Sequence, residues 1–344
     1  MSESDDLTGA LGRIAARYGD APPVVLPTRP DVTVVRAGSV VVKAHVPEVG
    51  RQELEARMRA VAGPALRGIL LEPVTGQVMT AGDRLVTVWP AGEPVDPDDP
   101  DAAPWEEGAR LLARLHAVPA EALPALPPAG GPARVGRTVA RLDGGSAAER
   151  VVRRAFECLP GLPPRPPAPS GAGSPANASP GSLAGASPEA SGAPSGAAPP
   201  RDAPPPAPVT GPCSLAHGDW HLGQMVRLRG EWILIDADDL GVGDPAWDLA
   251  RPAAWFAAGL LDPVVWHRFL AAYRAAGGCA VGAAGDPWER LDLPAQAMTV
   301  QLAAAAVAAA KREGRALDEV EQVLVDSCQR IVQFRNACHI VATQ

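Results

Sequence analysis

A long segment without large apolar side chains constrains this chain more than any other feature of its sequence. Residues 160–212 consist almost entirely of Pro, Ala, Gly and Ser. Such a segment cannot bury enough apolar surface to offset the entropy lost on ordering, so it is predicted to be a disordered insertion. The fold must therefore be built from the residues on either side of the insertion, which pack together across it.

The rest of the chain has enough apolar material for a substantial core. The 344 residues are 47% hydrophobic, and at about 150 residues per domain this length allows roughly two domains or lobes. The formal net charge of −8 disfavours a nucleic-acid partner or an anionic membrane surface, because either one requires a basic patch. A small-molecule partner is the expectation that remains.

The sequence favours a cytoplasmic location. Met1–Asp6 is acidic and polar, unlike a signal peptide, and the longest apolar run, Leu302–Ala310, is too short for a membrane helix. Five cysteines are spread along the chain without any C-x-x-C spacing. We expect these cysteines to be idle thiols in a reducing compartment rather than disulfides or zinc ligands.

The residues up to Trp89 have strand-like character. Residues 32–42 are rich in β-branched side chains and turn at 36–39, which predicts a hairpin. Arg84–Trp89 is a further strand, and residues 48–62 predict an intervening helix with one apolar side. This part of the chain is therefore predicted to be a small β-rich lobe.

Helical periodicity dominates the chain after this lobe. The predicted helices span residues 105–115, 147–158, 245–258, 263–276 and 294–312, and a last one starts at 317. The sequence therefore predicts an α+β fold of two lobes. A small β-rich lobe spans residues 1–88. A larger, mainly helical lobe spans residues 89–344 and contains the insertion.

Two short stretches contain nearly all the candidate chemistry. Residues 217–224 (HGDWHLGQ) follow a short apolar run, and residues 232–239 (WILIDADD) begin as an apolar strand and end in carboxylates. The chain turns back between them, so Asp219, Gln224 and Asp236 are expected to converge. A base for an attacking hydroxyl and hard oxygen ligands for Mg²⁺ are what phosphoryl transfer requires.

The two stretches resemble motifs of the aminoglycoside phosphotransferase superfamily. The triplet 217–219, with an amide five residues after its aspartate, resembles the catalytic loop of that superfamily. Residues 235–236 and the later run 243–250 (GDPAWDLA) resemble its metal-binding motif and the helix that follows. The likeness covers most of the chain outside the insertion. Gln224 departs from it, since most members have Asn there.

The resemblance implies a protein-kinase-like fold and an ATP-dependent kinase that phosphorylates a small molecule. It implies that Asp219 is the catalytic base and that Gln224 and Asp236 bind Mg²⁺. His217 and Asp248 would support the catalytic loop. ATP and Mg²⁺ are thus the expected cofactors.

In the first lobe the resemblance implies a nucleotide site. Lys43 would hold the phosphates of ATP, with Glu53 as its ion-pair partner, and Val88 and Trp89 resemble the hinge whose backbone holds adenine. No Gly-rich phosphate loop is visible before this lysine. The alternative partners for the lysine are Glu48 and Glu55.

The His-Leu-Gly-Gln ending of the catalytic loop resembles the maltokinase-like and actinobacterial glucosamine-kinase branches. It implies a sugar or amino-sugar acceptor, best glucosamine phosphorylated at its 6-hydroxyl, with maltose or an aminoglycoside as alternatives. Carboxylates suit an ammonium group and aromatic faces suit a sugar ring. The candidate substrate residues are His221, Asp238, Asp239, Trp247 and Trp255.

Two other classes of function stay open. His217, Asp219, His221 and the aspartates downstream of them could also bind zinc or manganese, as in a metal-dependent hydrolase. Gln224 and the missing Gly-rich loop suit a pseudokinase that binds a partner without catalysis. Metal content separates the first class from a kinase, and an ATP turnover assay separates the second.

Overall fold

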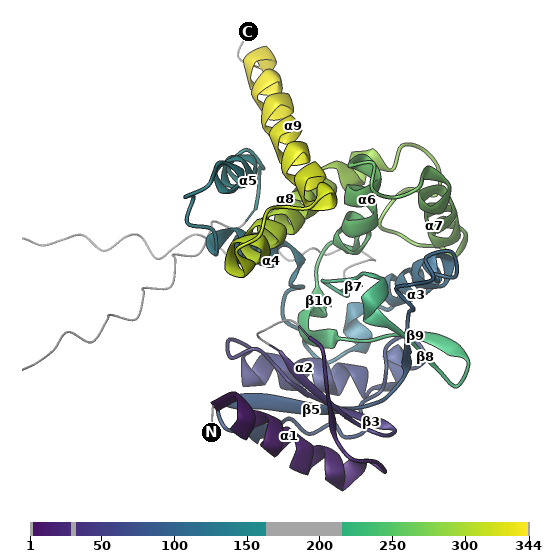
Figure 1. The fold of residues 1–344 in the computed structure, drawn as a ribbon. Coiled ribbons are helices and arrows are strands. Elements are labelled where there is room, and N and C mark those ends of the chain that lie inside the picture. Colours follow the sequence, from purple (N-terminus) through teal and green to yellow (C-terminus); the bar gives the residue numbers. More distant parts are fainter. Residues whose placement is uncertain (1–2, 29–31, 163–214, 343–344) are drawn as a thin grey trace, which may run out of the picture. The chain divides into compact units, whose positions relative to one another are not determined.

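The computed structural model describes residues 3–28, 32–162 and 215–342. Of the predicted insertion, all but residues 160–162 lies outside the described residues. The described elements comprise an antiparallel sheet formed by N-terminal residues and a group of helices formed by C-terminal residues (Figure 1). The predicted α+β fold class is confirmed.

The N-terminal sheet has the strand order β1-β2-β3-β5-β4, and all its pairs are antiparallel. Helix α1 (Glu3–Tyr18), which the sequence did not predict, packs on β2 and β3 and buries Leu11 and Ala15 there. Helix α2 (Arg51–Val61) confirms the predicted helix of this lobe. The strands are β1 (Val24–Leu26), β2 (Thr33–Ala37), β3 (Val40–Ala44), β4 (Met79–Ala81) and β5 (Arg84–Pro90).

The β2–β3 hairpin sets the register that positions Lys43. Its turn contains Gly38 with a φ of 61°, a left-handed conformation that glycine adopts without strain. The resulting register places Lys43 opposite Thr87 of β5. Because side chains alternate along a strand, Lys43 and His45, two residues apart, project from the same face of the sheet.

Most of the predicted C-terminal helices are confirmed, with two differences. Helix α4 was missed, since it follows and begins in a run rich in Pro and Gly, which indicates a loop. The predicted helix 245–258 is a 3₁₀ turn, Pro245–Leu249, followed by α6. The helices are α3 (Trp105–His116), α4 (Gly131–Ala140), α5 (Ala147–Glu157), α6 (Ala250–Ala257), α7 (Pro263–Ala275), α8 (Trp288–Glu313) and α9 (Glu319–Ala342).

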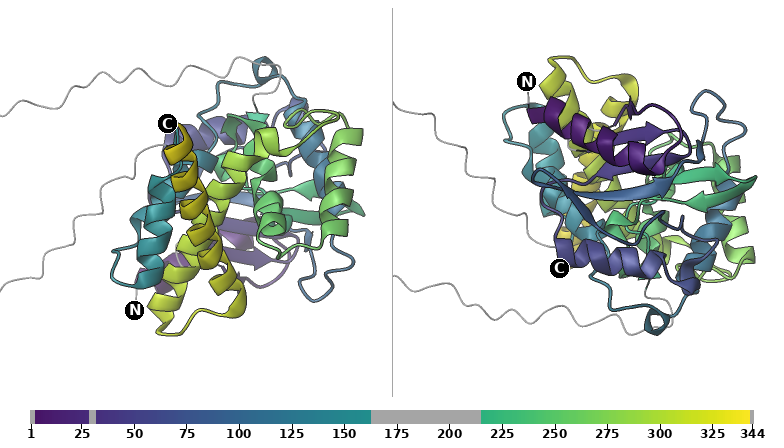
Figure 2. Two further views of the ribbon diagram at one scale, coloured as in Figure 1. Left: turned by 90° about the horizontal axis from the view of Figure 1, so that it is seen from above. Right: turned by 90° about the horizontal axis from the view of Figure 1, so that it is seen from below.

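Helix α8 is a core helix of the C-terminal group. It packs against α4, α6 and α9, and Figure 2 shows it running beside α9. Among the described helices it alone is long and apolar enough to cross a membrane, but 61% of its apolar window is buried inside the fold. The short run Leu302–Ala310 did not reveal this, because the small apolar residues of α8 extend over a longer stretch.

Short strands position the candidate chemistry. Strands β8 (Met225–Leu228) and β9 (Glu231–Leu234) form a hairpin, to which β6 (Glu93–Pro94) adds along β8. Strand β7 (Leu215–Ala216) pairs with β10 (Gly241–Val242). The residues of the two predicted active-site stretches therefore lie at the ends of paired strands, as a catalytic loop requires.

Aromatic side chains pack beneath the catalytic loop. Trp220, only 2% exposed, stacks on Phe269 of α7 with ring centroids 5.3 Å apart and meets Trp105 of α3 edge-on at 6.3 Å. Gly108 of α3 permits this, because a Cβ there would lie 2.6 Å from the Trp220 ring. The residue after Asp219 is thus held by the α3–α7 core.

Gly108→Ala is predicted to lower the free energy of unfolding by about 1–3 kcal/mol, because the added methyl overpacks against Trp220. Urea denaturation measures this change. The matched control is Gly9→Ala at an exposed position of α1. The added Cβ would lie 3.6 Å from its nearest neighbour, so this substitution should stabilise the protein by about 0.5–1 kcal/mol. Equal effects of the two substitutions would contradict the tight packing of Trp220.

Candidate active site

The loop that carries Asp219 is anchored by one buried carboxylate. The backbone N–H groups of His217 and Gly218 donate to Asp248, at 2.6 and 2.8 Å. Asp248 is fully buried, and His116 Nε2 lies 2.9 Å from its Oδ2. The predicted supporting role of Asp248 is what this geometry provides, because each oxygen fixes one N–H of the loop.

A hydrogen-bonded chain behind Asp248 fixes the tautomer of His116. Tyr273 Oη accepts from the N–H of Ala280 at 2.9 Å and lies 2.7 Å from His116 Nδ1. The Tyr273 hydroxyl therefore donates to Nδ1, which leaves the Nε2–H of His116 to donate to Asp248. Burial raises the pKa of Tyr273, so this hydroxyl keeps its proton.

The catalytic loop also approaches the chain after β9 closely. Gly218 has a φ of 86°, and a Cβ there would lie 2.3 Å from the backbone oxygen of Asp239. Only glycine fits this position. On the other side of the loop, His217 Nε2 lies 2.8 Å from the carbonyl oxygen of Ile235, which ties His217 to the second stretch.

Asp219 lies between two guanidinium groups. Arg134 of α4 and Arg251 of α6 contact one carboxylate oxygen each, and the Arg251 distance is 3.2 Å. Asp219 is 8% exposed. Burial acts to raise the pKa of Asp219, but the two arginines outweigh burial and lower it, so this carboxylate is ionised at neutral pH.

Asp236, the predicted metal ligand, contacts both Lys43 of the N-terminal sheet and Gln224 of the first stretch. Lys43 Nζ lies 2.6 Å from its Oδ1, and Gln224 Nε2 lies 3.1 Å from its Oδ2. Asp236 has a φ of 66°, a left-handed conformation that Asp tolerates better than most residues. The structure thus brings Gln224 and Asp236 together, as the sequence predicts, and adds Lys43, whose contact with Asp236 was not predicted.

Asp238 is a second partner of Lys43. Lys43 Nζ lies 2.8 Å from Asp238, and His45 Nδ1 lies 3.0 Å from the same carboxylate. Burial opposes the charge of Lys43, but Asp236 and Asp238 outweigh it and raise the pKa of Lys43. Despite burial, Lys43 and His45 hold the pKa of Asp238 well below its usual range. Thr87 Oγ1 completes the row at 2.8 Å from His45 Nε2.

The predicted partner of Lys43 is wrong. Glu53 lies 3.6 Å from Arg57 one helical turn later, and Glu55 pairs with Arg51 at 3.3 Å. Among the described residues, the ion pairs of Lys43 go to Asp236 and Asp238 instead. Arg57 also donates to the carbonyl of Leu240 at 2.9 Å, so α2 contacts the second stretch through an arginine. Glu48, the other alternative, has no ion pair with Lys43 in the described part of the chain.

The expected hinge residues have structural partners. Val88 is fully buried in the sheet, and its carbonyl oxygen accepts from the N–H of Val74 at 2.9 Å. Trp89 is partly buried, and its Nε1 donates to Thr87 at 2.8 Å. Adenine binding by this backbone stays a prediction. The carbonyl oxygen of Val88 already accepts a hydrogen bond within the protein, which disfavours its use as a contact to adenine.

The expected substrate residues divide into two groups. Asp239 contacts Arg134 and lies 3.8 Å from Arg137, so it is ion-paired within the protein, as Asp238 is. Trp247 packs against the core of the C-terminal helices, and Trp255 meets Trp105 edge-on at 6.4 Å. The structure therefore uses these four residues internally.

His221 is held in its neutral form beside the catalytic loop. Burial is the largest cause that lowers the pKa of His221, to about 4, and the charge of Arg251 adds to it. Its Nδ1 accepts from the N–H of Gly223 at 3.1 Å, which leaves Nε2 to carry the proton. No group of three metal-ligating His, Cys, Asp or Glu side chains occurs among the described residues, so His217, Asp219 and His221 do not form the cluster that a hydrolase site would need.

Four functional side chains escaped the sequence analysis: His45, His116, Arg134 and Arg251. Only His45 had a local signal, since it lies two residues after Lys43 on the same strand face. Arg134 lies on the helix that was not predicted, and its contact with Asp219 spans 85 residues. Periodicity carries no information about such a long-range pair.

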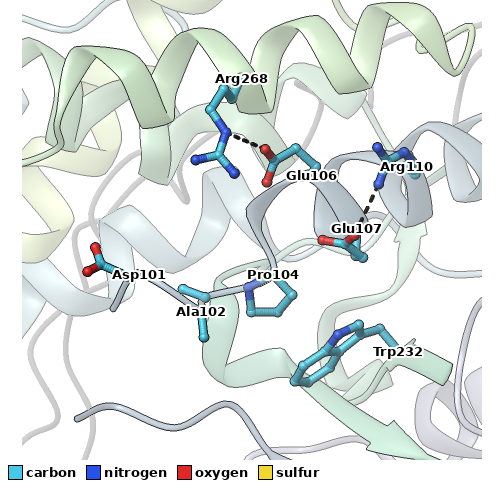
Figure 3. Close-up of a pocket in the computed structure, with 9 residues that line it drawn as sticks. Asp101, Ala102, Pro104, Glu106, Glu107, Arg110, Trp232 and Arg268 are labelled. Carbon is cyan, nitrogen blue, oxygen red and sulfur yellow. Dashed lines mark hydrogen bonds and ion pairs between the residues drawn. The ribbon is translucent and has the colours of Figure 1, made fainter. Parts of the chain in front are cut away.

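A surface pocket elsewhere contains none of these residues. It lies at the start of α3, where Glu106 pairs with Arg268 at 2.5 Å and Glu107 with Arg110 at 3.2 Å (Figure 3). Trp232 of β9 forms its other wall. Because its acidic groups on α3 are already paired with arginines, we assign it no role.

Cysteine chemistry differs from the expectation at one position. Cys158 and Cys328 are free thiols, and burial raises the pKa of Cys328 to about 12. Cys279 is disulfide-bonded. The expectation that the cysteines are idle thiols is therefore wrong for Cys279.

No family model and no curated protein matches this chain. Solved structures do match along nearly its full length. An amicoumacin kinase, hAmiN, in complex with AMP-PNP, Ca²⁺ and Ami has a TM-score of 0.57 at 14% identity, covering 97% of this chain and 94% of that one. A choline/ethanolamine kinase family protein from Mesorhizobium loti has a TM-score of 0.53 at 16% identity, covering 96% and 94%.

A third matching structure contains both ADP and hygromycin B. It is a thermostable mutant of an aminoglycoside phosphotransferase in a ternary complex with ADP and hygromycin B, with a TM-score of 0.52 at 10% identity, covering 95% of this chain and 98% of that one. At these identities the comparisons establish the fold. This chain has the two-lobed protein-kinase-like fold that the sequence predicted.

Asp248→Ala is predicted to lower the free energy of unfolding by at least about 3 kcal/mol, because the buried N–H groups of His217 and Gly218 lose their acceptor. Asp248→Asn keeps one acceptor oxygen and should cost less. Urea denaturation gives both values. Asp262→Ala, which removes the exposed N-cap of α7, is the matched control with an expected loss of about 1 kcal/mol. A loss in Asp248→Ala no larger than in this control would contradict the anchoring role.

Proposed function

We propose that the protein is an ATP-dependent small-molecule kinase that transfers the γ-phosphoryl group to a hydroxyl group. The observation that carries the proposal is the meeting of Lys43 and Gln224 on the carboxylate of Asp236. Lys43 and Asp236 lie 193 residues apart in sequence, and a core would not bury such a group without need, since desolvating charges is costly. Phosphoryl transfer needs this combination of a lysine, a carboxylate and an amide.

The donor set fits a magnesium ion. Asp236 and Gln224 would hold it, because carboxylate and amide oxygens are hard donors and the two side chains lie within 3.1 Å of each other. The bound ion would offset the charge of the nucleotide phosphates. Lys43 would then exchange its contacts with Asp236 and Asp238 for the phosphates. The AMP-PNP and Ca²⁺ in the amicoumacin kinase complex support a nucleotide and a divalent cation in this fold.

Asp219 would act as the base that accepts the hydroxyl proton. Its carboxylate is ionised and buried, and the loop that carries it is anchored by Asp248. A base held in one orientation positions the attacking oxygen, which phosphoryl transfer requires more than strong basicity. A cytoplasmic location, where ATP is available, stays the prediction made from the sequence.

Glucosamine, phosphorylated at its 6-hydroxyl, stays a prediction for the acceptor. The ammonium was expected to bind Asp238 and Asp239, but Lys43 and His45 occupy the first and Arg134 the second. Release of ADP with a panel of sugars, amino sugars and aminoglycosides tests this acceptor against maltose and hygromycin-like compounds. Equal rates of ADP release with glucose and glucosamine would contradict the hypothesis that the site recognises the amine.

The alternative proposal is that the protein is a pseudokinase, and two observations favour it. The Lys43–Glu53 ion pair is absent, and the candidate metal ligand is a Gln in the position that most such kinases give to Asn. A pseudokinase would bind AMP-PNP without releasing ADP from ATP under any acceptor. The kinase proposal requires ADP release that depends on Asp219.

Asp219→Asn is predicted to lower turnover by roughly 10²-fold or more, because the amide cannot accept the hydroxyl proton. ADP release with the best acceptor from the panel measures the change, and circular dichroism confirms that the variant is folded. Asp262→Asn, a change of the same chemistry at an exposed helix cap, should leave turnover unchanged. Turnover of a folded Asp219→Asn protein close to wild type would remove Asp219 from the mechanism.

Gln224→Ala is predicted to raise the magnesium concentration needed for half-maximal activity, because one hard oxygen donor is lost. Gln224→Asn keeps the amide and should restore part of the affinity. A magnesium titration at saturating ATP measures both. Identical titrations for Gln224→Ala and the wild type would assign Gln224 a purely structural role.

A further inference from the structure

Arginines outnumber carboxylates around Asp219. Arg134 contacts both Asp219 and Asp239, Arg251 lies 3.2 Å from Asp219, and Arg137 lies 3.8 Å from Asp239. Three guanidinium groups thus face two carboxylates, which leaves one net positive charge. The excess is confined to α4 and α6, the two helices beside the catalytic loop.

The charge balance has the opposite sign around Lys43. There, two carboxylates, Asp236 and Asp238, share one lysine, so carboxylates outnumber the lysine. This acidic half suits a divalent cation. The basic half, around Asp219, is where an acceptor hydroxyl must lie if Asp219 is the base. The acceptor therefore meets an excess of positive charge.

Two buried donors in the basic half lack a partner. Within the described part of the chain, the Nε atoms of Arg134 and Arg251 are buried and make no hydrogen bond. A buried donor left unpaired costs free energy, so such donors usually have a partner in the functional state. Burial is the main cause that lowers the pKa of Arg137, and Arg134, Arg141 and Arg57 lower it further, whereas Glu48 raises it.

We propose that the acceptor carries an anionic group, a carboxylate or a phosphate monoester, which Arg134 and Arg251 bind beside Asp219. The proposal rests on the kinase function proposed above and names its substrate class. Guanidinium groups bind such anions through paired hydrogen bonds. An ammonium group would be repelled by the same arginines, so the proposal opposes glucosamine as the acceptor.

The bound anion would also free the base. When Arg134 and Arg251 turn to the acceptor anion, Asp219 recovers lone pairs that the arginines now occupy. The hydroxyl proton then passes to Asp219, and the acceptor oxygen forms a bond to the γ-phosphorus. The bond from that phosphorus to its bridging oxygen breaks, and ADP leaves with that electron pair. A neutral alcohol would leave the arginines on Asp219.

The test is calorimetric binding to the nucleotide-free full chain with four probes that share a hydroxyl scaffold. Glycerate carries a carboxylate, glycerol 3-phosphate a phosphate, glycerol neither, and 2-aminopropane-1,3-diol an ammonium. We expect at least one anion to bind and the neutral and cationic probes not to bind. The stronger of the two anions identifies the anionic group of the acceptor. Equal binding of all four probes, or of none, would overturn the proposal.

Arg251→Gln is the decisive variant, because Arg251 holds one carboxylate whereas Arg134 holds two and its loss endangers folding. We expect anion affinity to fall about tenfold or more, the worth of one charge-assisted hydrogen bond. Arg251→Lys keeps the charge without the fork and should lie between. Arg154→Gln, at an exposed arginine of α5, should bind like the wild type.

Two further measurements separate this proposal from its alternatives. If Lys43→Ala abolishes anion binding and Arg251→Gln does not, the anion occupies the nucleotide phosphate site and the proposal fails. ADP release is measured in parallel. If ADP release depends on Asp219 but no anion binds, the kinase function is supported and the anionic acceptor is rejected. If an anion binds through the arginines but ADP is not released under any condition, the proposed kinase function is rejected and only an anion-binding site remains.

Discussion

The buried carboxylate of Asp248 is the contact on which the site depends. It accepts the N–H groups of His217 and Gly218, and so fixes the backbone that carries Asp219 into the solvent-poor interior. His116, which contacts Tyr273, lies 2.9 Å from the same carboxylate and provides a third partner for it. A buried carboxylate with three donors is satisfied, whereas one without them would be costly. The catalytic loop is therefore rigid for reasons that lie in α3 and α7, far from its own sequence.

From this anchor the site separates into two halves of opposite charge. Lys43 brings the N-terminal sheet onto Asp236 and Asp238, where the balance is negative, while Arg134 and Arg251 surround Asp219, where it is positive. A short stretch of the chain, Asp236–Asp239, supplies carboxylates to both halves. Asp236 and Asp238 both contact Lys43, whereas Asp239 contacts Arg134, and the short helical turn Ala237–Asp239 that follows the left-handed Asp236 connects the two halves.

The sequence predicted the parts of this arrangement that have local signals. The hairpin of β2 and β3, the strand β5 and most helices follow from periodicity and turn residues. The contact between Gln224 and Asp236 follows from two strand-like stretches that a turn joins. What the sequence could not provide was pairing. Which acid meets Lys43, and which cation meets Asp219, depends on contacts 85 to 193 residues apart. Helix α4 begins in a run rich in Pro and Gly and was not predicted, so nothing placed Arg134 beside Asp219 and Asp239.

The missed pairs bear on how the site would take up its ligands. Lys43 is shared by two carboxylates, so a nucleotide phosphate brought to it alone would add negative charge to a half that is already negative. A divalent cation held by Asp236 and Gln224 would offset these carboxylates. Lys43 is then free to turn from Asp236 toward phosphate oxygens. The electrostatics thus favour entry of the nucleotide together with its cation. The same reasoning applies to the other half, where an anion, rather than a cation, restores neutrality around Arg134, Arg137 and Arg251.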